Sequence, residues 1–466
     1  MNRDDYRSTT FIQQYTSQAS TLLRGPTWLE QPFICDGIRH AQVHQQAAQL
    51  YWHYMDTGHS SPICLASEDK TVCAAALLAA LAGGPPLLLP YALSPRALTA
   101  LQTATAYTHA LASPELELPA GIERLPLPTE LSGQESRPLP HKPVQGAMLY
   151  LFTGGSTGAP QLWSKTAANL FGEALFIAAH HGIGTQDRIA ATIAPYHIYG
   201  LLYSVLLPLV SGAAVLAETP SFPEEISEAV RANRISIFIS VPAHYRALQG
   251  KSCVSPDLRL AFSSADMLDA TSNQAFCQAN QVGIAEIYGS TETGGIACRN
   301  RFLGEEHFTV LPLVDWQPSH EKRLMVRSPF LSPELPLDAA GYFHTADRVA
   351  AQDDARFFLL GRADLVVKVA GKRVDMEAIR LLIQEQPGVR EALVLALPAT
   401  GSRENHIAAV VAESKPGIVE AEALRRVLGQ QLEPYALPRV IKIVAQIPVK
   451  ANGKYDREAI LALVAA

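Results

Sequence analysis

The sequence has few cysteines and no spacing that would pair them. Six cysteines are scattered along 466 residues, and none of them belongs to a Cys-x-x-Cys pair. Clustered cysteines are typical of metal centres and disulfide frameworks, so this scattering argues against both and favours a reducing compartment. We therefore expect a cytoplasmic protein.

An excess of positive charge is also missing. The net charge is -6 at pH 7, and acidic and basic residues are mixed along the chain. Nucleic-acid-binding proteins carry basic stripes, and membrane-surface proteins carry polybasic segments. We expect neither a nucleic acid nor a membrane as a partner, and the composition predicts nothing about the oligomeric state.

A long uninterrupted hydrophobic run is absent as well. The N-terminus is polar and acidic, unlike the apolar core of a signal peptide. Residues 71–93 carry no charge, but Gly83-Gly84-Pro85-Pro86 divides them into two pieces. Each piece is shorter than the roughly 20 apolar residues of a membrane helix. The stretch predicts a buried helix, a turn and a buried strand, with a membrane helix as the less favoured alternative.

What the sequence does contain is a large apolar fraction and an alternation of strands with helices. Hydrophobic residues make up 48% of the chain, and the length suggests two or three domains. Such alternation is typical of parallel, buried sheets. Strands are expected at 62–66, 87–89, 148–152, 188–193, 213–217, 235–241, 258–263 and 284–288, and helices at 72–82, 96–105, 165–182, 201–210 and 223–233.

The pattern changes towards the C-terminus. From about residue 307, shorter alternating strands (307–311, 324–327 and 357–360) predict a small antiparallel section. A compact α+β tail follows, with strands at 365–369, 392–397, 407–412 and 440–444 and helices at 375–384 and 421–430. We therefore expect an α/β fold with a large N-terminal domain, 1–363, and a small C-terminal domain, 364–466.

Two turns made of small residues follow two of the expected strands. The first turn, residues 153–160, begins with six residues that are only Thr, Gly and Ser, and the second turn, residues 289–295, reads Gly-Ser-Thr-Glu-Thr-Gly-Gly. Backbone N–H groups in such turns can surround an anion. The first turn lacks the Gly-Lys-Ser/Thr ending of a P-loop, and taken alone either turn could be an ordinary surface turn.

Six stretches together resemble the acyl-adenylate-forming superfamily, which includes acyl-CoA synthetases, luciferases and the adenylation domains of peptide synthetases. They are Phe-Thr-Gly-Gly-Ser-Thr-Gly-Ala-Pro at 152–160, Pro-Tyr-His-Ile-Tyr-Gly at 195–200, Tyr-Gly-Ser-Thr-Glu-Thr at 288–293, Gly-Tyr-Phe-His-Thr-Ala-Asp at 341–347, Gly-Arg-Ala-Asp at 361–364 and Asn-Gly-Lys at 452–454. The resemblance implies a large domain that holds ATP and an acid, and a small mobile domain that closes over them. It implies formation of an acyl-AMP with release of pyrophosphate, then transfer of the acyl group to a thiol.

The resemblance also implies roles for the two turns. In the first turn, hydroxyls and backbone N–H groups would hold the β- and γ-phosphates, through Thr153, Gly154, Gly155, Ser156, Thr157 and Gly158. In the second turn, Thr291 would bind the α-phosphate and Glu292 would ligate Mg²⁺, which commonly takes one or two carboxylates. One departure is Gln161, where the family usually has a lysine; Lys165 is four places further on.

Other residues would hold the nucleoside. Tyr288, with Gly289, Ser264 and Ala265, would lie against adenine, although the family tends to have glycines where this chain has Ser263-Ser264. Asp347 would accept the ribose hydroxyls beside Ala346, which replaces a usual glycine, and Arg362 would add a ribose or phosphate contact. The alternatives are a core aromatic for Tyr288, a solvated charge for Glu292 and a surface ion pair for Asp347 and Arg362.

The C-terminal domain would supply one catalytic charge. Lys454 would bridge the attacking carboxylate and the phosphate oxygens, and Asp364 would be the hinge that moves it. Without the resemblance, residues 452–454 would be interpreted as a hairpin turn.

The acid pocket would be lined by His197, Tyr199, Val241, His244 and Ile287. His197 lies where amino-acid-activating members have an aspartate, and a neutral imidazole is a poor partner for an ammonium group. This favours an acid without an α-amino group: aryl, cinnamic-type or medium acyl. The acceptor thiol would belong to coenzyme A or to the phosphopantetheine arm of an acyl carrier protein. The alternative for His197 is a packed histidine with no role in the acid site. The alternatives for the function are an adenylating enzyme with a non-thiol second step and an inactive nucleotide-binding relative.

Overall fold

Two compact units make up the chain, each with its own hydrophobic core. The computed structural model describes residues 9–131, 137–153, 161–251, 255–362, 366–369, 372–398, 405–449 and 455–465. The first unit comprises Met1–Trp316 with Val326–Phe343, and the second comprises Gln317–Met325 with His344–Ala466. The boundary expected near Asp364 lies outside the described residues and stays a prediction.

The first unit contains a six-stranded sheet in the order β4-β3-β1-β2-β5-β6. Its strands pair in parallel except for β6, which returns antiparallel to β5. The strands are β1 (Ile63–Ala66), β2 (Leu87–Leu89), β3 (His109–Ala112), β4 (Glu123–Leu125), β5 (Ala147–Thr153) and β6 (Gln161–Thr166). The helices of this region are α1 (Thr9–Arg24), α2 (His40–Asp56), α3 (Lys70–Leu81), α4 (Pro95–Thr105) and α5 (Ala167–His180).

A second sheet of the first unit runs in the order β13-β12-β11-β10-β9-β7-β8. Strands β7 to β11 pair in parallel, whereas β12 and β13 are antiparallel. The strands are β7 (Arg188–Ala191), β8 (Ala214–Val215), β9 (Ile237–Ser240), β10 (Leu260–Ser263), β11 (Ile284–Ser290), β12 (Gly294–Arg299) and β13 (Phe308–Val310). The helices are α6 (Ile198–Leu201), the π-helical η2 (Leu202–Leu206), α7 (Leu207–Ser211), α8 (Pro223–Ala232), α9 (Pro242–Ala247) and α10 (Ala270–Asn280).

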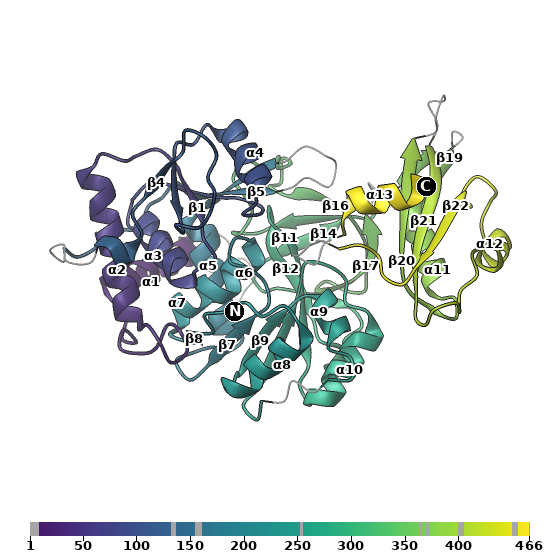
Figure 1. The fold of residues 1–466 in the computed structure, drawn as a ribbon, viewed down its shortest axis with the longest axis horizontal. Coiled ribbons are helices and arrows are strands. Elements are labelled where there is room, and N and C mark those ends of the chain that lie inside the picture. Colours follow the sequence, from purple (N-terminus) through teal and green to yellow (C-terminus); the bar gives the residue numbers. More distant parts are fainter. Residues whose placement is uncertain are drawn as a thin grey trace. The chain divides into compact units, whose positions relative to one another are not determined.

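Alternation along the strands explains how helices cover both faces of each sheet. Successive strand side chains point to opposite faces. Ile63 and Leu65 of β1 therefore join the central core with α2, α3 and α5, whereas Cys64 packs with α4 on the other face. In the second sheet Ile237 joins the same central core, and Phe238 packs with residues of α8, α9 and α10. Figure 1 shows these three helices lying together beside the strands of this sheet. The result is a layered α/β unit with apolar strands, as expected from the sequence.

The uncharged stretch 71–93 forms the buried elements predicted for it. Helix α3 is buried along its whole length, and β2 follows after the turn at Gly83-Gly84. Among the described residues, none of the helices is both long and apolar enough to cross a membrane. One prediction is wrong: residues 165 and 166 belong to strand β6, and α5 begins only at Ala167, after the N-cap residue Thr166.

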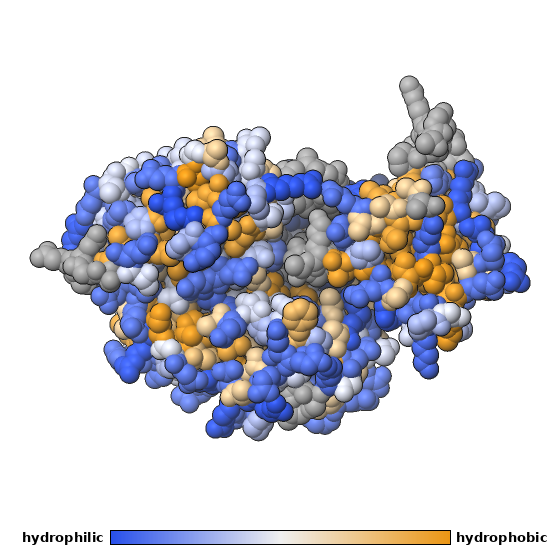
Figure 2. All heavy atoms as spheres, in the orientation of Figure 1, coloured by the Kyte–Doolittle hydropathy of each residue, from blue (hydrophilic) through white to orange (hydrophobic). Residues whose placement is uncertain are grey.

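The second unit is the expected small α+β structure. Strand β20 pairs antiparallel with β21, which pairs in parallel with β22, and β18 forms a hairpin with β19. Half-buried aliphatic side chains remain on its sheet, among them Leu393, Leu395 and Val444, and hydrophobic residues reach the surface of this unit (Figure 2). Its elements are β18 (Val366–Val369), β19 (Lys372–Asp375), α11 (Met376–Gln384), β20 (Val389–Pro398), β21 (Asn405–Glu413), α12 (Ala421–Gly429), β22 (Val440–Val444) and α13 (Arg457–Ala465).

Shorter strands fall around the division between the units. They are β14 (Asp315–Pro318), β15 (Arg323–Arg327), β16 (Phe343–Ala351) and β17 (Arg356–Arg362). Strand β16 pairs antiparallel with β17, as β12 does with β13. The antiparallel section predicted from about residue 307 is confirmed.

Candidate functional site

The carboxyl ends of β9, β10 and β11 bring several of the predicted site residues together. The three strands are neighbours and parallel, so the segments that follow them share one edge of the sheet. Val241 follows β9, and Ser264 follows β10. The Ser264 hydroxyl donates a 3.0 Å hydrogen bond to the carbonyl oxygen of Ile287 in β11. The edge therefore carries residues predicted for both the nucleotide and the acid.

Ala265, in the turn after β10, has a left-handed backbone with φ of 76°. A residue with a Cβ atom pays about 1–2 kcal/mol for this conformation. The turn is therefore held in a shape that glycine would adopt more easily.

The second turn joins β11 to β12 and is closed by its own hydroxyls. Thr293 Oγ1 accepts a 3.0 Å hydrogen bond from the backbone N–H of Ser290 and lies 2.9 Å from Ser290 Oγ. A Cβ atom on Gly289 would lie 2.3 Å from the carbonyl oxygen of Gly294, so only glycine fits there. This geometry presents Thr291 and Glu292, both half-buried, between the two strands.

Two buried charges lie beneath the second turn. Lys165 on β6 is 2% exposed, and its Nζ donates to the carbonyl oxygens of Phe330 at 2.9 Å and Glu292 at 3.3 Å. Glu173 on α5 accepts a 2.7 Å hydrogen bond from the backbone N–H of Gly295. Burial lowers the pKa of Lys165 to about 8, against the opposing effect of Glu173, and burial raises the pKa of Glu173. The turn is thus fixed to charged side chains at its middle, through Glu292, and at its C-terminal end, through Gly295.

The first turn connects β5 to β6, and most of it lies outside the described residues. These include Gly154, Gly155, Ser156, Thr157 and Gly158, whose phosphate-binding roles stay predictions. The flanking residues Thr153 and Gln161 are paired across the hairpin, and Thr153 Oγ1 donates to the Gln161 carbonyl oxygen at 3.3 Å. Gln161 is exposed. Lys165 is buried and faces the second turn, so it does not take the place of the lysine that is missing at 161.

The residues predicted for the acid pocket are linked through Ser240 and Thr192. His244 Nδ1 lies 2.7 Å from Thr192 Oγ1, which lies 2.9 Å from Ser240 Oγ. The hydroxyl of Tyr199 donates to the Ser240 carbonyl oxygen at 3.3 Å. Burial lowers the pKa of His244, which favours the neutral form of its ring. His197 immediately precedes α6, and its ring centroid lies 4.6 Å from that of Tyr196.

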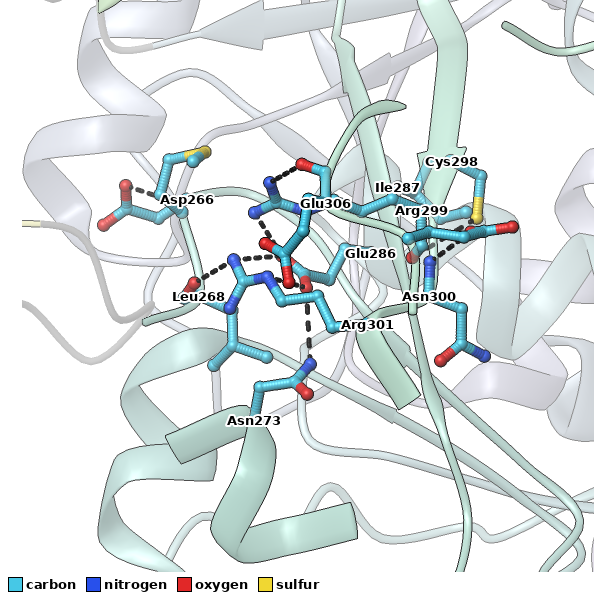
Figure 3. Close-up of polar contacts among 12 residues, drawn as sticks. Asp266, Leu268, Asn273, Glu286, Ile287, Cys298, Arg299, Asn300, Arg301 and Glu306 are labelled. Carbon is cyan, nitrogen blue, oxygen red and sulfur yellow. Dashed lines mark hydrogen bonds and ion pairs between the residues drawn. The ribbon is translucent and has the colours of Figure 1, made fainter. Parts of the chain in front are cut away.

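A buried ion-pair network surrounds Glu286 of β11 (Figure 3). Glu286 Oε2 accepts hydrogen bonds from Arg299 at 2.9 Å and from Arg301 at 3.3 Å. The Arg299 guanidinium also lies over the Phe308 ring, whose centroid is 5.6 Å from that of Tyr288. The Tyr288 ring, which is predicted to lie against adenine, therefore packs near Phe308, and Phe308 is in turn covered by the Arg299 guanidinium.

The ribose candidates lie together in the second unit. Asp347 on β16 is paired with Arg362 on β17, and Arg362 Nη1 is 3.9 Å from Asp347 Oδ1. This matches the alternative to a ribose contact, an ion pair, which here joins an exposed arginine to a half-buried aspartate. Lys454 and Asp364 lie outside the described residues, and their roles stay predictions.

Sequence reasoning missed the groups that support the site. Lys165, Glu173, Glu286 and Thr192 had no assigned role. A signal existed for two of them, because Lys165 and Glu173 are single charges beside or within apolar segments, where charged residues are seldom buried unless paired. Glu286 and Thr192 carry no comparable signal, since their partners come from distant strands.

The layered fold defines an α/β type of protein, and family comparison makes the class specific. The chain belongs to the AMP-binding enzyme family: the family model matches residues 42–322, and the model of the AMP-binding enzyme C-terminal domain matches residues 381–454.

Curated relatives have low sequence identity to this chain but align with a large part of it. A sulfoacetate–CoA ligase of Cupriavidus necator is 24% identical over 345 residues, which is 69% of this chain and 68% of the relative. A 4-coumarate–CoA ligase of Rhodobacter capsulatus is 27% identical over 65% of this chain and 73% of its own length. A p-hydroxybenzoic acid–AMP ligase of Mycobacterium tuberculosis is 28% identical over 93% of this chain, which spans 66% of that relative.

Solved structures agree with the fold. ATP-bound MatB from Rhodopseudomonas palustris matches with a TM-score of 0.81 at 18% identity, covering 96% of this chain and 98% of MatB. A benzoate CoA ligase from Burkholderia xenovorans matches with a TM-score of 0.78 at 20% identity, covering 95% and 99%. At these identities the likeness shows the shared fold alone.

Proposed function

We propose that the protein is an AMP-forming acid–thiol ligase. A carboxylate oxygen of the acid attacks the α-phosphate of ATP, and pyrophosphate leaves to give an acyl-AMP. A thiol then attacks the acyl carbon, forming the thioester and releasing AMP and a proton. The first step requires placement and neutralisation of charge more than covalent help from the protein. Family membership and relatives named as CoA or AMP ligases support this reaction class.

The observation that carries the proposal is the construction of the second turn. The Glu292 carboxylate makes no hydrogen bond within the part of the chain that the structure describes, while the backbone around it is fixed by Lys165 and Glu173. A single, half-buried carboxylate beside small-residue turns fits Mg²⁺, which is usually shared between one or two carboxylates and the phosphates. Glu292 would hold Mg²⁺, and the ion would neutralise charge on the phosphates.

The acid site supports an acid without an α-amino group. His197 and His244 offer no negative charge to an ammonium group, and Tyr199 and Ile287 offer aromatic and apolar surface. Among the relatives, the names 4-coumarate, p-hydroxybenzoic acid and benzoate all denote aryl acids. We infer an aryl or cinnamic-type acid as the first choice and a medium acyl chain as the second. Coenzyme A and the phosphopantetheine of an acyl carrier protein remain the two acceptors.

Pyrophosphate exchange over a panel of acids tests the proposal. The purified chain is assayed with Mg-ATP and 4-hydroxybenzoate, benzoate, 4-coumarate, octanoate or phenylalanine. Exchange with at least one non-amino acid and none with phenylalanine is expected. Exchange with none of them, with Mg-ATP not bound either, would overturn the proposal in favour of an inactive relative. AMP release that needs neither coenzyme A nor a carrier protein would favour a non-thiol second step.

A further inference from the structure

Lys165 and Glu173 contact the second turn from two elements that lie outside the β11–β12 hairpin. Lys165 comes from β6, and Glu173 comes from α5. The carbonyl oxygen of Glu292 accepts from Lys165 Nζ at 3.3 Å and from the backbone N–H of Ser332 at 2.8 Å. Beyond Glu292, the Gly295 N–H donates to Glu173. The backbone is therefore anchored to the scaffold of the first unit at the tip of the turn and at its C-terminal end.

These buried charges are a costly way to hold a turn. A buried ammonium or carboxylate loses its hydration, and well-packed apolar side chains are often as stable or more stable in its place. Lys165 finds two carbonyl oxygens and lies close to the carboxylates of Glu173, Glu292 and Glu334. A requirement for a fixed backbone geometry at the turn therefore explains the presence of buried Lys165 and Glu173 better than a gain in stability does.

We propose that Lys165 and Glu173 are positioning residues that aim the Glu292 carboxylate at the magnesium ion of bound Mg-ATP. The inference rests on the proposed function, because it assumes that Glu292 is the Mg²⁺ ligand. Mg²⁺ demands near-ideal octahedral geometry, so a small displacement of the backbone at Glu292 lowers its affinity. Groups that orient a metal ligand typically affect metal affinity by about 10- to 100-fold.

Lys70 provides a matched control. It is another buried lysine of the first unit, 1% exposed, and burial lowers its pKa to about 8 as well. Its Nζ donates to the carbonyl oxygens of Leu216, Ala217 and Glu218, which lie after β8, and it makes no contact with the second turn. Replacing it removes a comparable buried charge without releasing Glu292.

The test compares ATP binding with and without Mg²⁺ by isothermal titration calorimetry on the full chain. For Lys165→Met we expect the Mg-ATP affinity to fall about tenfold or more, while the affinity for ATP in EDTA changes less than about twofold. Glu173→Gln keeps an acceptor oxygen for the Gly295 N–H, so it is the milder change and is expected to lose a smaller part of the same Mg²⁺-dependent affinity. Lys70→Met should keep the wild-type ratio between the two affinities.

Each outcome separates the two claims. Mg-ATP affinities of Lys165→Met and Glu173→Gln equal to that of the wild type would overturn the positioning role while leaving the proposed function intact. An equal loss in Lys70→Met would show a general effect of removing a buried charge and would also overturn it. If the wild-type chain binds Mg-ATP no more tightly than ATP in EDTA, the assignment of Glu292 fails, and the positioning role fails with it.

Discussion

The two small-residue turns of the first unit differ in what supports them. The first turn is flanked by Thr153 and the exposed, uncharged Gln161, which face each other across a hairpin. The second turn is anchored from below by buried Lys165 and Glu173. Strand β6 contributes to both, since it begins at Gln161 beside the first turn and ends next to Lys165 under the second. Lys165 of this strand therefore contacts the second turn, although it lies closer in the sequence to the first.

This difference teaches that the distance along the sequence between a charged residue and a turn does not decide which turn that residue contacts. A lysine near a phosphate turn is easily taken for a phosphate ligand, but the pairing of Lys165 with Leu149 buries it. Its side chain then reaches a turn more than a hundred residues away in the sequence. The contribution of each turn to activity can be measured by substituting residues of one turn at a time.

The largest effect is expected for Glu292→Gln in the second turn. The amide keeps the shape but removes the negative charge that would hold Mg²⁺, and loss of one such electrostatic contact costs about 10²–10³ in rate. Pyrophosphate exchange with the best acid of the panel, at several Mg²⁺ concentrations, measures it. Glu115→Gln, an exposed carboxylate elsewhere in the unit, is the control. Wild-type exchange in the Glu292 variant would make its carboxylate a solvated loop charge.

The second effect is on stability and concerns the lysine under the second turn. The pKa of Lys165 is about 8 in the folded protein, below the ordinary 10.5, so between these values the unfolded chain binds a proton that the folded chain has lost. The free energy of unfolding contributed by this residue therefore rises as the pH increases from 8 to 10.5, by on the order of 3 kcal/mol.

The free energy of unfolding of Lys165→Met should lack this rise with pH. Lys70→Met should keep the part of the rise that comes from Lys165. Urea unfolding at pH 7, 8, 9 and 10 measures the difference. Parallel pH curves for the wild type and Lys165→Met would mean that the lysine under the turn stays protonated and well solvated.

A third, smaller effect is expected at the first turn. Gln161→Lys introduces the residue that the family usually has, at an exposed position beside Thr153. An added exposed charge gains up to about 1 kcal/mol against the phosphates, which corresponds to a KM for ATP lowered by about fivefold or less. The gain should shrink with added salt. An unchanged KM at low salt would show that the first turn needs no cation at 161.

Much of the fold followed from the sequence because its signals are local. The apolar strands β1, β2, β9 and β10 and the helix α3 lie close to their predicted positions. Each is a continuous apolar segment bounded by polar or turn residues, so its position can be predicted from neighbouring residues alone. The start of α5 was misplaced because Lys165 and Thr166 fit a helix as well as a strand. Only the pairing of β6 with β5, which depends on a partner, decides between them.

The site followed less completely for the same reason. The resemblance named Thr291, Glu292, Tyr288 and Ser264 as candidates, and the structure brings the segments that carry them to one sheet edge, while their roles stay predictions. The supports came from elsewhere: Glu286 depends on Arg299 and Arg301, and His244 depends on Thr192. Such contacts join residues that are far apart in the chain, and no periodicity in one sequence records them.

The smallest effect extends the comparison to the turn after β10, which neighbours the second turn. Ala265 adopts a φ of 76°, whereas Gly289 and Gly294 occupy the crowded positions of the second turn. Ala265→Gly removes steric strain of about 1–2 kcal/mol but loosens the unfolded chain by about 0.5–1 kcal/mol, so a net stabilisation below about 1 kcal/mol is expected. The urea midpoint measures it, with Ala106→Gly at a second left-handed alanine, remote from the motifs, as the control. If both variants gain stability and only Ala265→Gly weakens ATP binding, the strained alanine serves the nucleotide site by holding Ser264 against Ile287. If neither gains stability, the surroundings of the two left-handed alanines relieve the strain expected of their backbone.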